Sequence, residues 1–245
     1  MTDYARIAEH FRSDFAEAQL KAQREDGLFR HIEFDAPKSM SRLVLVTWSY
    51  NLLVAGSHGS FHFERFGPDT EDMFDWLRGI RVEPDRWASK LVNGADSVRE
   101  YDRSLMEAEI KERVTEAVED NWAPQGLEAA VRSEILDSHL LDTKETAFHL
   151  LNEFEHGVKY EAKCACGAQV ERDSYGEALM WRSLDHNRND LGEEHEVSVR
   201  QSAGFSFDDL SEWSVDKVGY HFAYQCFAAS WAITQYDAAR KAVAA

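Results

Sequence analysis

The chain has 245 residues, of which 44% are hydrophobic and 12% aromatic, enough for a buried core and too many for a disordered chain. Its 45 aspartates and glutamates against 27 lysines and arginines give a net charge of −18, which excludes a basic surface for general binding of nucleic-acid phosphates. Three cysteines cannot form a fully paired disulfide framework, and the charged first residues lack the apolar segment of a secretory signal. We therefore expect a protein of a reducing compartment without a membrane span.

The N-terminal part of the chain predicts one helix followed by a small sheet. Apolar residues recur at helical spacing over residues 3–24, and Gly27 is expected to end that helix. Four short β-rich runs follow, and the turns between them are too short for parallel crossovers. They predict a four-stranded antiparallel meander, with strands over residues 28–34, 43–48, 52–55 and 61–66.

Helices dominate the rest of the chain. Pro68-Asp69-Thr70 predicts a helix over residues 70–78 with Asp69 as its N-cap. The final helix, over residues 217–242, is apolar on nearly all sides, so it is expected to be buried by neighbours on several sides. Periodicity also predicts helices over residues 84–91, 97–119, 127–141 and 144–154.

The composition changes at Gly157, after which residues 158–205 are polar and contain two of the three cysteines. We expect an α+β fold in which a small antiparallel meander sheet packs with helices around a buried C-terminal helix. Residues 1–157 and 206–245 would form the main domain, and residues 158–205 an inserted ββα module.

The strongest local signal for a ligand is Cys164-Ala165-Cys166-Gly167. Two thiolates beside a glycine that permits a tight turn resemble half of a zinc site. His186 and His195 are the only histidines in the inserted module, so with Cys164 and Cys166 they are the candidate ligands of a structural zinc. The spacing departs from the usual C-x2-C and H-x3–5-H, so a plain hairpin with two reduced cysteines remains the alternative.

A row of acidic residues follows the helix expected over residues 97–119. Glu109, Glu112 and Glu116 fall on one helical face because they are spaced three and seven positions apart. A solvated acidic face is the default interpretation. Rows of carboxylates also imitate the phosphates of DNA, so these three residues are candidates for binding a basic cleft on a partner.

Other motifs are weaker. There is no phosphate-binding glycine loop, and the adjacent Asp137, Ser138 and His139 do not form a catalytic triad because neighbouring helical side chains diverge. The aromatic residues, Trp122 among them, could form a base-stacking platform, but without flanking basic residues packing in a core or an interface is the better account.

The run Leu28–Phe34, the segment Gly56–Phe61, the run Asp72–Arg78 and the ending Tyr220–Asp237 resemble a family of hypothetical proteins common in bacteriophage and actinobacterial genomes. The resemblance covers most of the chain and departs at residues 158–205. It carries no activity or site. It implies a phage-borne accessory protein that acts in the bacterial host cytoplasm.

These observations lead us to expect an acidic accessory protein of phage type that acts without catalysis. It would bind a basic surface of a host or defence protein, with nucleic-acid mimicry as one mode, and would bind neither nucleic acid nor membrane directly. Two alternatives remain open: a metal-dependent hydrolase or nuclease, and a protein that sequesters a nucleotide signal.

Overall fold

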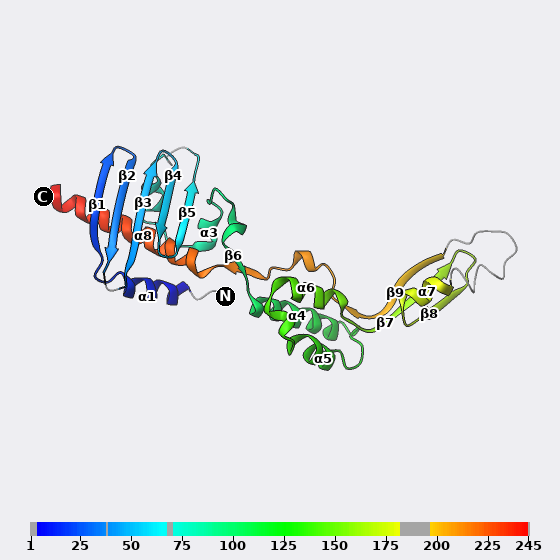
Figure 1. Ribbon diagram of the computed structural model, residues 1–245. Helices are drawn as coiled ribbons and strands as arrows, with labels where there is room; N and C mark the ends of the chain where they lie inside the picture. The colour runs from blue at the N-terminus through cyan, green and yellow to red at the C-terminus, as the bar shows by residue number, and fades with distance from the viewer. Residues whose placement is uncertain (1–3, 38, 68–70, 182–196, 245) are drawn as a thin grey trace. The chain divides into compact units, whose positions relative to one another are not determined.

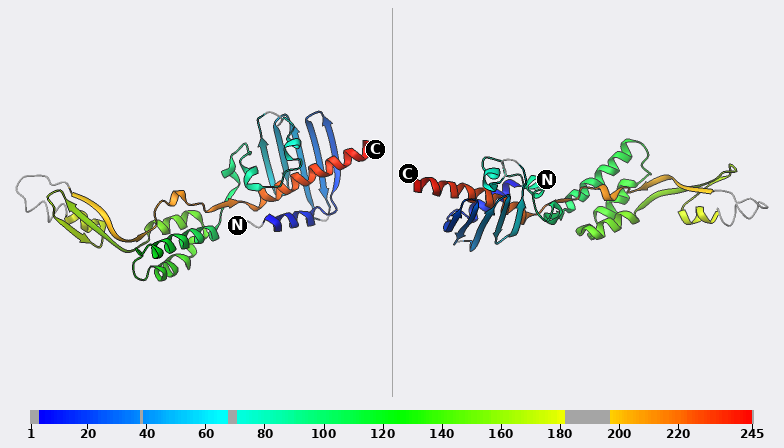
Figure 2. Two further views of the ribbon diagram at one scale, coloured as in Figure 1. Left: turned by 180° about the vertical axis from the view of Figure 1, so that it is seen from behind. Right: turned by 90° about the horizontal axis from the view of Figure 1, so that it is seen from above.

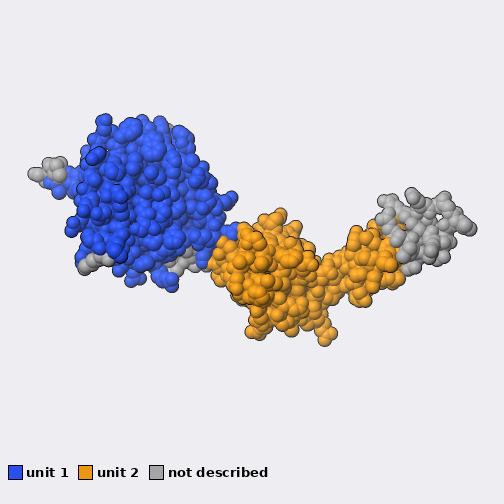
Figure 3. Space-filling view, viewed as in Figure 1, with its two compact units in different colours: residues 1–100, 216–245 blue, residues 101–215 orange. Residues whose placement is uncertain are grey.

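The computed structural model describes residues 4–37, 39–67, 71–181 and 197–244. The chain forms two compact units (Figure 3): unit 1 contains residues 1–100 and 216–245, and unit 2 contains residues 101–215. These boundaries differ from the expected insertion of residues 158–205, because the helices after residue 102 build a hydrophobic core of their own with the segment 205–215. The expected α+β class is confirmed.

Unit 1 is built on an antiparallel meander in the order β1-β2-β3-β4-β5 (Figure 1). Along β2, the side chains of Arg30, Ile32 and Phe34 are buried and alternate with half-buried neighbours, so one face of the sheet packs on the helices. We call this the inner face. The strands are β1 (Gln19–Asp26), β2 (Phe29–Ala36), β3 (Ser41–Trp48), β4 (Asn51–Gly56) and β5 (Gly59–Glu64).

The helix expected over residues 3–24 is wrong in its second half. Helix α1 (Tyr4–Asp14) ends early, and residues 19–26 form β1, a polar edge strand that makes the sheet five-stranded. The two-residue turn between β1 and β2 pairs Asp26 with Phe29, and Gly27 takes a φ of 60° there. A glycine at the first position of the two-residue turn, Gly27-Leu28, is a hairpin signal that competes with helical spacing, and the hydrogen-bond ladder to β2 decides the outcome.

The C-terminal helix α8 (Tyr220–Ala244) lies across the inner face, as expected (Figure 1). Its Ala223, Ala229 and Ala232 are fully buried and let the helix approach the sheet closely. Gly56 of β4 is required at this contact, because a Cβ atom there would lie 2.5 Å from the carbonyl oxygen of Arg42 and 2.9 Å from Nε2 of Gln225.

Shorter elements complete unit 1. Asp69 lies outside the described residues, and Asp72 caps α2 (Met73–Leu77) by accepting a hydrogen bond from the backbone N–H of Phe74. Helix α3 (Pro84–Ala88) begins at a proline, as helices often do. The remaining elements are the 3-10 helix η1 (Ala95–Val98) and the paired strands β6 (Arg99–Tyr101) and β10 (Asp216–Val218).

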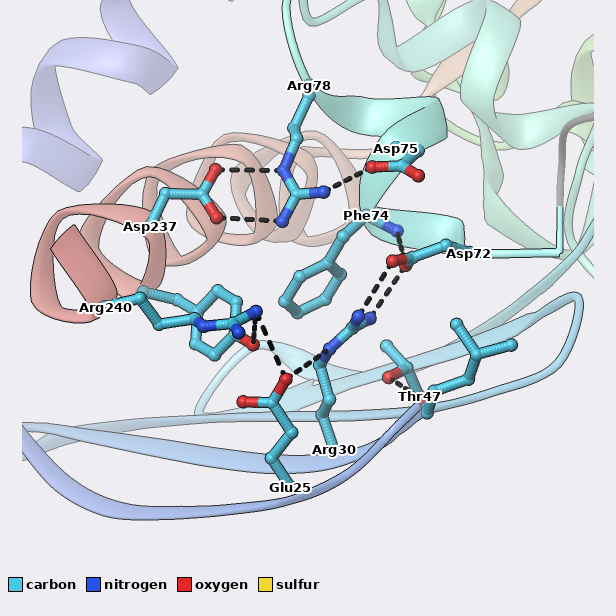
Figure 4. Close-up of polar contacts among 11 residues, drawn as sticks. Glu25, Arg30, Thr47, Asp72, Phe74, Asp75, Arg78, Asp237 and Arg240 are labelled. Atoms are coloured by element: carbon cyan, nitrogen blue, oxygen red, sulfur yellow. Dashed lines mark hydrogen bonds and ion pairs between the residues drawn. The ribbon is translucent and has the colours of Figure 1, made fainter. Parts of the chain in front are cut away.

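A buried arginine joins the sheet to α2 (Figure 4). Arg30 is 7% exposed and donates two hydrogen bonds to Asp72, at 2.7 and 2.8 Å, while its guanidinium lies over the ring of Phe74. Arg78 makes a similar paired contact with Asp237 of α8, at 2.9 and 2.8 Å. These charges are satisfied within unit 1, so we assign the network a structural role.

Unit 2 begins with a helical part. Helix α4 (Arg103–Glu119) starts at Asp102, which accepts hydrogen bonds from Ser104 and Leu105, because residues 95–101 form η1 and β6 instead of the helix expected from residue 97. The helix expected over residues 127–141 is divided. Its parts are α5 (Leu127–Ala130), the π-helix η2 (Val131–Leu136) and the 3-10 helix η3 (His139–Asp142), which precede α6 (Lys144–Glu153).

The expected ββα module is present in unit 2. Its elements are β7 (Glu155–Cys164), β8 (Gln169–Arg172) and α7 (Tyr175–Met180). A further strand, β9 (Val197–Ser206), pairs with β7 on the other side and had no counterpart among the expected elements. Gly204, with a φ of 93°, lets β9 pass β7, because a Cβ atom there would lie 2.3 Å from Cα of Val158. The 3-10 helix η5 (Leu210–Glu212) follows β9.

Candidate functional site: an acidic groove with an aromatic floor

A stack of aromatic rings connects the end of α4 to the end of β9 within unit 2. The rings of Trp122 and Phe205 are nearly parallel, with centroids 5.6 Å apart and an angle of 17° between their planes. Phe207 meets Phe205 edge-on at 4.9 Å. Phe205 is 1% exposed whereas Trp122 is 50% exposed, so the stack has a buried base and an open indole face.

The position of Trp122 follows from the way α4 ends. Asn121 takes the left-handed conformation, with a φ of 58°. Its N–H bonds to the carbonyl of Val118, and the N–H of Trp122 bonds to the carbonyl of Ala117. This is the Schellman arrangement, in which a left-handed residue after the helix satisfies the last carbonyls and turns the chain. The indole is thereby held at the helix end.

The other wall of the groove comes from the chain after β9. Asp209 also takes a left-handed conformation, with a φ of 51°, and starts the turn of η5. Phe207 points into the helical core, where it also contacts Trp213 at 5.7 Å. Asp208, Asp209 and Glu212 remain exposed at the surface.

Together these segments enclose a groove of about 310 Å³. Its floor is aromatic, and its rim carries four carboxylates against the single cation of Arg113, which pairs with Glu116 at 3.2 Å. The lining residues are Arg113, Glu116, Trp122, Phe205, Ser206, Phe207, Asp208, Asp209 and Glu212. We call this the acidic groove.

The acidic groove lies in the more charged half of the protein. Residues 101–215 contain 26 aspartates and glutamates against 11 lysines and arginines, so unit 2 carries a charge of −15 and unit 1 only −3. Carboxylates beside an open indole face are the combination that holds a guanidinium or ammonium group, through ion pairing and a cation–π contact. Its volume lies at the lower end of the range for ligand pockets and suits one or two side chains.

The structure places one of the three predicted acidic residues in this groove. Glu116 lines it, whereas Glu109 is half-buried and Glu112 is exposed on α4 outside the lining. The row of carboxylates exists on one face of α4, but its role as a mimic of DNA remains a prediction.

The zinc site also remains a prediction. Cys164 is buried at the end of β7, and its sulfur accepts a hydrogen bond from the N–H of Cys166 at 3.4 Å. Cys166 is exposed in the following turn. His186 and His195 lie outside the described residues. Elemental analysis of protein purified without chelator would test the prediction directly.

A second group of polar side chains lies on unit 1, where His10, His58 and His221 come together from distant segments of the chain. Nδ1 of His58 and Nδ1 of His221 are 2.8 Å apart, so one imidazole donates a proton and the other accepts it. Burial lowers the pKa of His58, and the charge of His221 lowers it further. His10 contacts the hydroxyl of Tyr220, and Asp14 accepts a hydrogen bond from Tyr224 at 2.7 Å. We call these side chains the histidine cluster.

A larger hollow, of about 510 Å³, lies between α4 and η2. Its charges alternate in sign: Glu107, Glu128 and Asp137 stand among Lys111 and Arg132. Lys111 already pairs with Glu107 at 3.5 Å. This hollow therefore favours a charged ligand less than the acidic groove does.

Sequence reasoning missed the acidic groove. Trp122 was considered only as one aromatic among many, and Phe205, Asp208 and Asp209 attracted no functional interpretation. One local signal was available: an asparagine followed three residues later by a proline is typical of a left-handed helix end, and it would place Trp122 directly after the helix.

Among the described residues, no group of three or more histidine, cysteine, aspartate and glutamate side chains is arranged to hold a metal ion. None of the described helices has the length and apolar character needed to cross a bilayer. Comparison with family models, with curated proteins and with solved structures finds no match to this chain.

Proposed function

We propose that the protein acts without catalysis, by capturing a basic segment of a host or defence protein in the acidic groove. The observation that carries this proposal is the half-exposed indole of Trp122, stacked on the buried Phe205 and surrounded by four carboxylates. An arginine or lysine of the partner would lie on the indole and pair with the rim. Arg113, which already pairs with Glu116, illustrates the kind of side chain that the rim accepts.

The charge of unit 2 supports the same proposal at longer range. A charge of −15 attracts a basic partner before contact and raises the association rate at low salt. This long-range term is screened over about 8 Å at physiological ionic strength, so it cannot by itself select a site. The aromatic floor of the groove supplies the short-range attraction that selects the site.

The mimicry of nucleic acid is a variant of this proposal. In that variant the carboxylates of Glu109, Glu112 and Glu116 would replace phosphates in a basic cleft of the partner. The resemblance to phage proteins favours a host protein as the partner in either variant. The two versions of the proposal share Glu116 and differ in the other carboxylates that they need.

The test uses a capped peptide of nine residues with alternating arginine and glycine, and its counterpart with glutamine in place of arginine. Binding to the full chain is measured by calorimetry at low and at physiological salt. Two variants each neutralise four carboxylates of unit 2 and so have the same net charge. The groove variant carries Glu116→Gln, Asp208→Asn, Asp209→Asn and Glu212→Gln, and the distal variant carries Glu109→Gln, Glu112→Gln, Glu134→Gln and Glu145→Gln.

We expect the arginine peptide to bind the wild-type chain and the glutamine peptide not to bind. At about 0.5–1 kcal/mol for each exposed ion pair, the groove variant should lose about 30-fold or more in affinity. The distal variant should lose only the small long-range part. Equal losses of affinity in the two variants would contradict the acidic groove as the binding site. A larger loss in the distal variant would favour the mimicry of nucleic acid.

A further inference from the structure

The five-stranded sheet of unit 1 has a second face that no described helix of that unit covers. The helices of unit 1 that pack on the sheet lie on its inner face, and α8 contacts β3, β4 and β5 there (Figure 2). We call the opposite side the outer face. The strand register places Val46 of β3 between His31 of β2 and Leu53 of β4 on this face. The next row has Val44 opposite Ala55.

The outer face is apolar along β3 and β4, where a solvated sheet would be polar, and its flanking strands carry polar and charged residues on this side. An antiparallel sheet with one face in water normally alternates apolar and polar residues along each strand. Here the central strand β3 has apolar residues on both sides: Leu43 and Leu45 face the core, and Val44, Val46 and Trp48 face outward. The outward residues are half-buried by their neighbours in the sheet and belong to none of the hydrophobic cores of the described residues.

Several of the charges around this apolar centre are paired within the chain. Arg42 contacts Glu33 at 2.8 Å, and Lys21 contacts Asp35 at 3.4 Å. The polar groups near Trp48 are also engaged, since His62 bonds to Asn51 at 2.8 Å and its ring lies 5.2 Å from the indole. The outer face therefore offers an apolar centre on β3 and β4, surrounded by a polar margin in which part of the charge is paired.

We propose that the outer face packs against the outer face of a second copy of this chain. Five strands about 4.8 Å apart, with about six residues each at roughly 3.3 Å, give on the order of 500 Å² per copy. Two such faces together reach the roughly 1,000 Å² that a specific interface needs. Sheets pack face to face in this way about 10 Å apart, with their inner side chains interdigitated.

The distribution of charge favours a second copy over a charged partner at this face. Two chains of −18 repel each other, so self-association is tolerable only through the part of the chain that carries little charge. Unit 1 carries only −3, and the apolar residues are centred on β3, the middle strand of the five. A patch centred on the middle strand can meet its own copy about a two-fold axis.

The test is the mass of the full chain in solution, measured by sedimentation equilibrium at about 50 μM and at physiological salt. We expect about twice the 28.1 kDa of one chain for the wild type. Val46→Arg and Leu53→Arg each place a charge in the centre of the outer face, where a single chain tolerates it. Ile80→Arg is the matched control, because Ile80 is an exposed aliphatic residue of unit 1 in the loop after α2.

Both face variants should sediment as single chains and keep the circular dichroism spectrum and melting temperature of a folded protein, whereas Ile80→Arg should remain dimeric. A wild type that sediments as a single chain at this concentration would overturn the proposal. So would a dimer that survives both face variants. Peptide binding in the acidic groove does not depend on either outcome, so the two proposals fail separately.

Discussion

Trp122 and Phe205 stack with their ring centroids 5.6 Å apart, although one follows a helix and the other ends a strand far along the chain. Phe205 is buried and Trp122 is half-exposed, so the two rings have different roles. We expect Phe205→Ala to destabilise unit 2 by about 3–5 kcal/mol, the range for loss of a buried aromatic side chain.

Trp122→Ala should cost only about 1 kcal/mol in the same urea unfolding experiment, because half of the indole is already in water. It should nevertheless weaken binding of the arginine peptide about 3- to 10-fold, through loss of the cation–π contact. A loss of stability as large as that of Phe205→Ala would show that Trp122 belongs to the core.

The buried pair of Arg30 and Asp72 should be sensitive to loss of one partner (Figure 4). Asp72→Ala leaves a buried guanidinium without its carboxylate and removes the cap of α2, so we expect a loss of about 3–5 kcal/mol. Asp75→Ala is the control, because Asp75 is exposed and contacts the more exposed Arg78. The double variant Arg30→Met/Asp72→Ala should be less destabilised than Asp72→Ala alone. If the loss of stability in the double variant equals the sum of the losses in Arg30→Met and Asp72→Ala, the two residues are not coupled.

The histidine cluster predicts a dependence of stability on pH. Burial first, and the charge of His221 second, lower the pKa of His58 in the folded chain below its usual value of about 6.5. The folded state therefore binds this proton less readily than the unfolded state does. The stabilisation is present above about pH 6.5 and is lost as the pH falls through the lower folded-state pKa.

The melting temperature of unit 1 should consequently fall between pH 7 and pH 5, and His58→Gln should reduce that fall. His139→Gln, at an exposed histidine of unit 2, should leave it unchanged. If the melting temperature depends on pH in the same way in the wild type and in His58→Gln, the histidine cluster does not cause that dependence.

Gly204 in β9 and Gly176 in α7, both in unit 2, give a matched pair of substitutions. Gly204→Ala should destabilise unit 2 by several kcal/mol, because its Cβ atom would meet the backbone of Val158 at 2.3 Å in a left-handed conformation. Gly176→Ala, in α7, has open space around the new methyl group and should be neutral or slightly stabilising. Urea unfolding followed by circular dichroism separates the two results.

Local patterns of the sequence predicted much of the fold and little of the site. The imperfect alternation in residues 28–34, the β-rich run over residues 43–48 and the turns between strands identify the meander, and the all-round apolar ending identifies α8. β1 was mistaken for helix because an edge strand is polar and lacks the alternation that reveals a buried strand. The acidic groove depends on the return of β9 beside α4, and the histidine cluster on the approach of α1 and the β4–β5 turn to α8. Such long-range contacts leave no local signature in one sequence.

Binding in the acidic groove is observed directly through the indole N–H resonance of Trp122, in a nitrogen-15 spectrum of the full chain during titration with the arginine peptide. Trp122→Phe assigns the resonance. We predict that this resonance shifts and saturates with the affinity found by calorimetry, while that of Trp231, which packs on Phe11, Phe15 and Phe34 in unit 1, stays in place. Peptide binding that leaves the Trp122 resonance unmoved would contradict the assignment of the acidic groove as the binding site.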